Sequence, residues 1–135
     1  MFLVDANVLS EATRPTPARS VNEWLTLHES DLVVTPIVLG EIAYGIRLTP
    51  VGRKRTKLQQ WFADGVERLH VLPLDAGTAT AWADLLARLK RKGLSMPVKD
   101  SLIAASALQH GLTIATRNTD DFKHAGVKLI DPFQF

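Results

Sequence analysis

The 135-residue chain contains no cysteine. This absence excludes disulfide bonds and thiolate metal sites, and it fits a reducing compartment, so we expect a cytoplasmic protein. No apolar run approaches the roughly 18 residues that a membrane helix needs, and the first residues lack the basic and apolar regions of a signal peptide. Repeats, low-complexity tracts and linkers are also missing. We therefore expect a single domain over residues 1–135 with no membrane association.

Charge is modest overall but unevenly distributed. The chain has 16 Lys and Arg against 14 Asp and Glu, a formal net charge of +2. One basic cluster comprises Arg53, Lys54, Arg55 and Lys57, and a second comprises Arg88, Lys90, Arg91 and Lys92. Each cluster is compatible either with a solvated helix face or with a surface that holds the phosphate backbone of a nucleic acid.

Short apolar runs alternate with helical patterns along the chain. The strand-like runs lie at 2–5, 31–35, 69–72, 112–116 and 127–130. The first and fourth are apolar on both faces, which is typical of buried parallel strands. The pattern predicts an α/β fold: one α/β/α domain with a central, mostly parallel sheet of four or five strands.

Several local signals predict where helices begin and end. Ser20 and Glu23 have the spacing of a capping box, and Thr35 precedes a proline that suits the first helical position. Asp75 is placed to cap a later helix, and Pro97 to start the next one. Gly111 falls where a glycine commonly ends a helix.

Three acidic residues stand where an α/β fold gathers its active site. Asp5 ends the first strand-like run, and ligands of parallel sheets bind beyond the carboxyl ends of strands. Glu41 lies in an otherwise apolar helical segment, and Asp100 lies in the first turn of another. Carboxylates that converge there repel one another, and a hard divalent cation relieves that repulsion. Each also has a structural interpretation: Asp5 as a helix cap, Glu41 on a solvent-exposed face, and Asp100 as a partner of the helix dipole.

A fourth polar cluster follows the strand-like run at 112–116 and includes Asn118 and Asp121. Because Thr116 ends that run, we expect this region to lie near Asp5. Asn118 and Asp121 also have the spacing of residues that cap a short helix. We interpret Glu11 as structural, and the four histidines show no metal-ligand spacing.

Together these segments resemble the four signatures of PIN-domain nucleases, in order and over nearly the whole chain. They are Asp5-Ala6-Asn7-Val8-Leu9, Glu41 in its helix, the stretch from Asp100 to Ala107, and the stretch from Thr116 to Phe122. The VapC-type toxins of bacterial toxin–antitoxin pairs look most similar. Many relatives have Asp where this chain has Asn118.

The resemblance implies an Mg²⁺-dependent ribonuclease in which Mn²⁺ can substitute. Asp5, Glu41 and Asp100 would be the metal ligands and catalytic acids, and Asn118 and Asp121 would complete the catalytic site. The expected partners are an RNA substrate, a small cognate antitoxin and a second copy of the chain. Two rival functions are a phospho-aspartate enzyme and a non-catalytic module that binds RNA or a protein partner. The segment Asp5-Ala6-Asn7 lacks the second acid of a phosphatase motif, which disfavours the first rival.

Overall fold

The computed structural model describes residues 1–135, which form one five-stranded sheet in which every pairing is parallel. Its strands are β1 (Phe2–Val4), β2 (Leu32–Val34), β3 (His70–Val71), β4 (Thr113–Ala115) and β5 (Lys128–Ile130). Each strand lies within one of the apolar runs that predicted it. The predicted parallel α/β sheet is therefore confirmed.

The strand order is β3-β2-β1-β4-β5, so the chain moves outward in one direction from β1 and later returns to its other side. The central pair is β1 and β4, in a register that places Val4 opposite Ala115. In such sheets the loops that leave the two central strands diverge, and ligands bind in the crevice between them. Asp5 and Thr116 are the residues that immediately follow this central pair.

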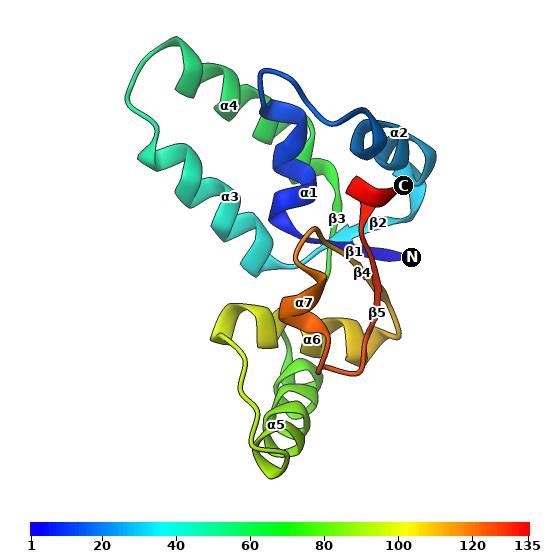
Figure 1. The fold of residues 1–135 in the computed structure, drawn as a ribbon. Coiled ribbons are helices and arrows are strands. Elements are labelled where there is room, and N and C mark those ends of the chain that lie inside the picture. Colours follow the sequence, from blue (N-terminus) through cyan, green and yellow to red (C-terminus); the bar gives the residue numbers. More distant parts are fainter.

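Helices cover both faces of the sheet, as Figure 1 shows. On one face lie α1 (Ala6–Ser10), α2 (Arg19–Leu27), α3 (Pro36–Leu48) and α4 (Arg53–Asp64). On the other lie α5 (Ala76–Arg91), α6 (Val98–His110) and the short α7 (Thr119–Phe122). Four 3₁₀ turns complete the chain, at Glu11–Thr13, Glu29–Asp31, Val66–Arg68 and Pro132–Gln134. No helix combines the length and the apolar character that crossing a membrane requires.

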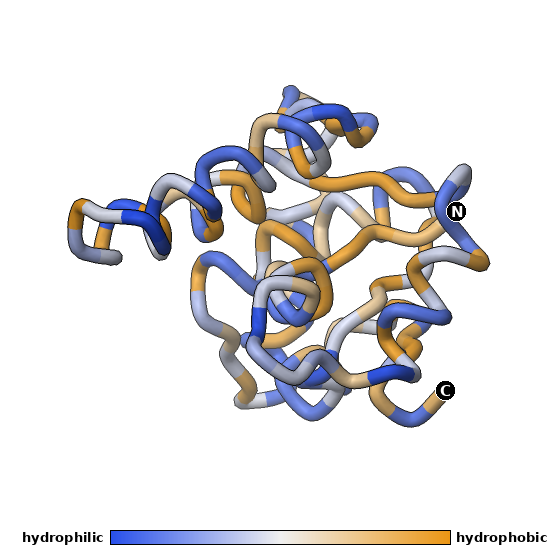
Figure 2. Tube along the Cα trace, turned by 90° about the horizontal axis from the view of Figure 1, so that it is seen from above, coloured by the Kyte–Doolittle hydropathy of each residue, from blue (hydrophilic) through white to orange (hydrophobic).

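Helices α3 and α4, which Figure 1 labels, form an arm that projects from the body of the molecule and is seen again in Figure 2. The inner strands β1, β2 and β4 are strongly apolar because both of their faces are covered, and Leu3, Val33 and Ile114 have no exposed surface. Helix α6 packs closely against the sheet and α5, which small buried residues such as Ala104 and Ala107 permit. This packing fixes the beginning of α6, and hence Asp100, at the carboxyl edge of the sheet.

Three of the predicted helix ends depend on contacts between near neighbours in sequence, and they are confirmed. The hydroxyl of Thr35 accepts a hydrogen bond from the Val38 amide at 3.3 Å, with Pro36 in the first helical position. The carboxylate of Asp75 accepts one from the Thr78 amide at 3.0 Å. Gly111 ends α6 with a φ of 65°, a conformation that residues with a Cβ rarely adopt.

The capping box predicted at Ser20 and Glu23 is wrong. Helix α2 begins at Arg19, and its N-cap is Ala18, which has no side chain that could accept a hydrogen bond. The buried carboxylate of Glu11 accepts a hydrogen bond from the Ala18 amide instead, at 2.8 Å. Glu23 forms a surface ion pair with Arg19. The interpretation of Glu11 as a structural residue agrees with these contacts.

We expect Glu11→Ala to lower the free energy of unfolding by about 1–2 kcal/mol, because the Ala18 amide loses a charged acceptor. Glu11→Gln keeps an acceptor oxygen at the same place and should lose less. Urea denaturation of the two variants and the parent protein measures the difference. Equal losses for both variants would show that the hydrogen bond to Ala18 does not stabilise this junction.

Candidate active site

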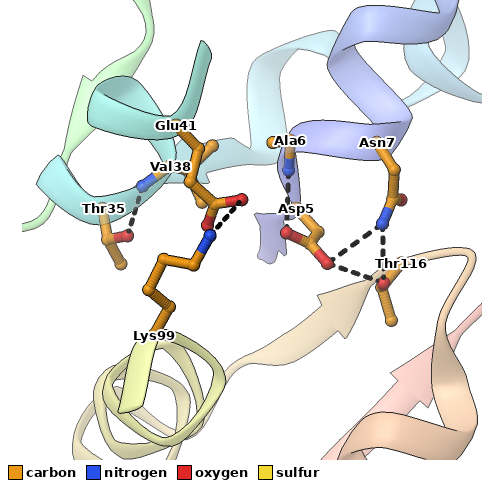
Figure 3. A network of polar contacts seen from close by, with 8 residues as sticks. All are labelled: Asp5, Ala6, Asn7, Thr35, Val38, Glu41, Lys99 and Thr116. Atoms are coloured by element: carbon orange, nitrogen blue, oxygen red, sulfur yellow. Dashed lines mark hydrogen bonds and ion pairs between the residues drawn. The ribbon is translucent and has the colours of Figure 1, made fainter. Parts of the chain in front are cut away.

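Asp5 is held rigidly at the carboxyl end of β1. Its backbone amide continues the sheet by donating to the Ala115 carbonyl at 2.9 Å. One carboxylate oxygen accepts from the Ala6 amide at 2.8 Å and so caps α1. The other accepts from the Thr116 hydroxyl at 2.8 Å and from the Asn7 side-chain amide at 3.2 Å (Figure 3). With only 6% of its surface exposed, Asp5 has an orientation set by these donors.

Thr116 and Asn7 join the ends of the two central strands. The Thr116 hydroxyl donates to Asp5 and accepts from the Asn118 backbone amide at 3.0 Å. The Asn7 side-chain oxygen accepts from the Arg117 amide at 3.0 Å. The prediction that the region after β4 lies beside Asp5 is therefore confirmed. These contacts leave the Asp5 carboxylate fixed against both strands.

Glu41 reaches the same edge from α3. It lies about one turn inside that helix, and 26% of its side chain is exposed. Burial raises the pKa of Glu41, the nearby ammonium group of Lys99 opposes that rise, and the charges of Asp5 and Asp100 add to it. The Lys99 nitrogen lies 3.8 Å from a Glu41 oxygen, pointing toward Glu41 from the first turn of α6 (Figure 3). Glu41 is thus part of an acidic cluster with one positive neighbour.

Asp100 is the third residue of α6 and is partly buried. Burial raises the pKa of its carboxyl group above the ordinary value, and the charges of Asp5 and Asp121 raise it further. The positive charge of Lys99 acts in the opposite direction. Asp121 lies on α7, which contacts α6, the helix that carries Asp100.

Asn118 contributes to this region through its backbone. It occupies the N-cap position of α7, but its side chain makes no capping hydrogen bond and is exposed. The alternative in which the Asn118 side chain caps α7 therefore does not hold. A catalytic role for that side chain stays a prediction.

The chemistry of these side chains fits a divalent cation. Asp5, Glu41, Asp100 and Asp121 supply hard oxygen donors, which Mg²⁺ and Mn²⁺ prefer, against the single charge of Lys99. No three acidic or histidine side chains are placed closely enough to hold an ion without further adjustment. Mg²⁺, however, commonly binds through one or two carboxylates and keeps several waters. The cluster thus suits a hydrated ion better than a fully protein-enclosed one.

Sequence reasoning missed Lys99, Thr116 and Asn7 as members of the site. The signal for Thr116 was its position at the end of the fourth apolar run, since Asp5 ends the first run in the same way. Asn7 lies two residues after Asp5, within reach of a side-chain contact. For Lys99 the only signal was its position next to Asp100, and the direction of a long flexible side chain cannot be read from the sequence.

Comparison with known proteins supports this picture of the fold. Residues 2–128 match the PIN domain family. The chain is 33% identical to the VapC ribonuclease Y4jK of Sinorhizobium fredii and 34% identical to the toxin FitB of Neisseria gonorrhoeae. The first comparison covers 99% of both chains, and the second covers 98% of this chain and 99% of FitB.

Among solved structures, the FitAB structure bound to a DNA fragment contains a chain that superposes with a TM-score of 0.92 at 33% identity. The superposition covers 100% of this chain and 97% of that one. A parallel sheet with acidic residues at its central carboxyl edge defines the class of α/β proteins that bind ligands in that crevice. Within that class, the chain belongs to the PIN-domain family.

We expect Lys99→Met to change the response of the protein to metal. In EDTA the variant should melt at a lower temperature than the parent, because the acidic cluster loses its neighbouring cation. Millimolar Mn²⁺ should then raise the melting temperature more than in the parent, because the ion binds only the folded state and no internal cation competes. Thermal scans with and without Mn²⁺ measure this, with Lys57→Met on α4 as the matched control. Equal Mn²⁺ shifts in Lys99→Met and the parent would contradict it.

The raised pKa values of Glu41 and Asp100 predict that these two groups lower the stability of the folded protein in a pH-dependent way. A carboxyl group whose pKa is higher in the folded than in the unfolded protein lowers stability as pH rises through that pKa. Without metal, the Glu41→Gln, Asp100→Asn double variant should therefore be more stable than the parent at pH 8. The difference should shrink as the pH falls toward about 3, where both groups are mostly protonated in either state. Urea unfolding in EDTA at the two pH values tests this, and a difference independent of pH would refute it.

Proposed function

We propose that this protein is a metal-dependent endoribonuclease and the toxin of a toxin–antitoxin pair. What supports the proposal is that Asp5, Glu41 and Asp100 come from three separate elements of a PIN-domain chain, and that Asp5 and Asp100 are near enough to raise the pKa of Glu41. The names of the relatives favour the same activity, since one is a ribonuclease and another a toxin.

In the proposed mechanism, Asp5, Glu41 and Asp100 would hold a hydrated Mg²⁺ or Mn²⁺ ion, directly or through its bound waters. When bound, such an ion would supply positive charge that activates water and offsets charge on the phosphate oxygens. The hydrogen bonds from Thr116 and Ala6 keep Asp5 oriented, so little reorganisation is needed when the site is used. Glu41 would act either as a direct ligand of the ion or as a base through a bound water.

The two basic clusters are suited to hold flanking phosphates, which positions RNA without reading its sequence. On α4, Arg53, Lys54 and Lys57 are exposed. On α5, Lys90 and Arg91 are exposed, and Lys92 lies exposed just after the helix ends. Arg88 is different, since its guanidinium donates to the Ala125 carbonyl at 2.7 Å and connects α5 to the loop before β5. We therefore assign Arg88 to stabilising the fold, and we assign phosphate contacts to the other residues of the two basic clusters.

The proposed partner is a small antitoxin whose segment lies over the acidic crevice. A basic side chain of that segment would neutralise the carboxylates and exclude the metal ion. The likeness to a chain of the FitAB structure supports such a partner. We also propose a homodimer and, because a toxin of this kind must meet cellular RNA, a cytoplasmic location.

Charge-removing substitutions test the proposed activity. Asp5→Asn, Glu41→Gln and Asp100→Asn should each reduce cleavage of a total RNA pool by a factor on the order of 100 or more, about 3 kcal/mol of barrier. The parent should lose its activity in EDTA, which a non-catalytic RNA-binding module would not show. Circular dichroism should confirm that each variant is folded. Retention of parental activity by Asp100→Asn would refute the assigned acidic core.

Substitutions of the exposed residues Asn118 and Asp121 should reduce RNA cleavage less than those of Asp5, Glu41 and Asp100. Asn118→Ala and Asp121→Asn should each lose about ten-fold in activity, since we assign them to orientation or to a second ion. Asn118→Asp adds the acid that many relatives have, so it should strengthen Mn²⁺ binding if position 118 is a ligand. Glu11→Gln is the control, because its carboxylate contacts Ala18 and Arg14 away from the crevice. Loss of activity in that control alone would mean that the wrong acids have been assigned.

A further inference from the structure

A surface pocket of about 500 Å³ opens beside the acidic cluster. It is lined by Pro36, Ile37, Gly40, Glu41, Tyr44 and Lys99. Five of these residues come from α3 and one from the first turn of α6. Glu41 and Lys99 belong both to this pocket and to the acidic cluster, so a molecule in the pocket would lie next to the proposed reaction centre.

The wall formed by α3 carries an exposed aromatic ring, that of Tyr44, near Glu41. Ile37, Glu41 and Tyr44 are spaced by four and three residues, so they lie along one face of the helix. Tyr44 is 65% exposed, although an aromatic ring of this size usually gains from being covered. No aromatic or cation–π partner is found for the Tyr44 ring within the protein.

Gly40 makes the room between these side chains. A Cβ atom added at Gly40 would meet nothing within 4 Å, so the space above this residue is open. The backbone of Gly40 is helical, with no positive φ that would require glycine. Glycine inside a helix lowers its stability relative to alanine, and no contact of the fold explains its presence here.

Lys99 supplies a positive charge at the edge of the pocket. Its side chain is 65% exposed and flexible, and its ammonium group stands 3.8 Å from Glu41. A phosphate that replaced solvent at this point would meet a cation on one side and the acidic cluster on the other. The pocket thus combines a flat aromatic face, an open floor and a cation next to the acids proposed to act on a phosphodiester.

We propose that this pocket binds an unpaired nucleobase of the RNA strand, stacked on Tyr44, in the nucleotide next to the cleaved phosphate. This inference rests on the proposed ribonuclease function and adds a substrate subsite to it. Stacking on an aromatic ring tolerates every base, because each has a π-face. A paired base cannot enter, so the subsite selects single-stranded RNA rather than a particular sequence.

The test measures kcat and KM on a short single-stranded RNA and on a series in which one abasic nucleotide moves along the strand. For the parent, an abasic nucleotide beside the cleaved bond should lower kcat/KM by about ten-fold or more, mainly through KM. Tyr44→Ala should cause a similar loss on the intact RNA and should remove the sensitivity to the abasic nucleotide at that position. Tyr44→Phe keeps the ring and should behave as the parent.

Two further variants separate a substrate role from a structural one. Leu48→Ala changes a residue that is also 65% exposed on α3 but does not line the pocket, so it should leave kcat/KM unchanged. Gly40→Leu should fill the pocket and lower kcat/KM about ten-fold, while the melting temperature stays equal or rises because leucine favours the helix. The Mn²⁺-induced shift in melting temperature should be the same in the Tyr44 and Leu48 variants as in the parent.

The inference is overturned if Tyr44→Ala matches Leu48→Ala, or if Tyr44→Ala keeps the full sensitivity to the abasic nucleotide. If the parent cleaves no RNA in Mn²⁺, the proposed function fails, but the subsite can still be judged. Fluorescence anisotropy of the labelled intact and abasic RNAs then compares the parent with Tyr44→Ala and Tyr44→Phe. Weaker binding in Tyr44→Ala alone supports the subsite, and equal binding by all three rejects it.

Discussion

Parallel pairing between β1 and β4 is the constraint on which the rest of this structure depends. Once Val4 lies opposite Ala115, the next residue of each strand must emerge at the same point of the sheet edge. The chain then leaves in two directions, into α1 from β1 and toward α7 from β4. The hydrogen bond of 2.8 Å between Thr116 and Asp5 is a direct result of that register. Glu41 and Asp100 reach this edge because α3 and α6, the helices that carry them, begin there.

The fold accepts an electrostatic cost at this edge. Packing of α3 and α6 against the sheet partly buries Glu41 and Asp100, and both carboxyl groups respond with raised pKa values. A site whose only function was structural would pair each acid with a base, whereas here one lysine serves the whole cluster. Groups perturbed by burial and by like charges often mark functional sites. The excess of acidic over basic side chains is thus a stronger indication of a functional site than any single carboxylate.

The sequence predicted those features that depend on neighbouring residues or on simple periodicity. Each strand was found because it lies in a short apolar run, and Thr35, Asp75 and Gly111 were found because caps are local. The start of α2 was not found, because its acceptor, Glu11, lies seven residues before Ala18. Asp5 and its neighbourhood after β4 followed from the rule for parallel sheets.

Features that depend on the direction of a side chain were beyond the sequence. The ion pair between Lys99 and Glu41 joins two helices and requires both to be placed before it exists. The pocket beside Tyr44 depends on the open space at Gly40. The sequence alone does not show whether another part of the fold fills that space. The three-dimensional structure therefore adds most to the functional interpretation at exposed residues whose identity is not explained by neighbouring residues in the sequence.

The double use of Asp5 as cap and candidate catalyst has an evolutionary consequence. Asparagine is as good a helix cap as aspartate, and its amide oxygen can accept hydrogen bonds at the same place. A single nucleotide change converts either aspartate codon into an asparagine codon. If this protein harms its host, mutation has a short route to copies that fold normally yet have lost their chemistry. Such inactive variants would retain the surface of the parent protein. They would still bind, and so sequester, any partner that recognises that surface.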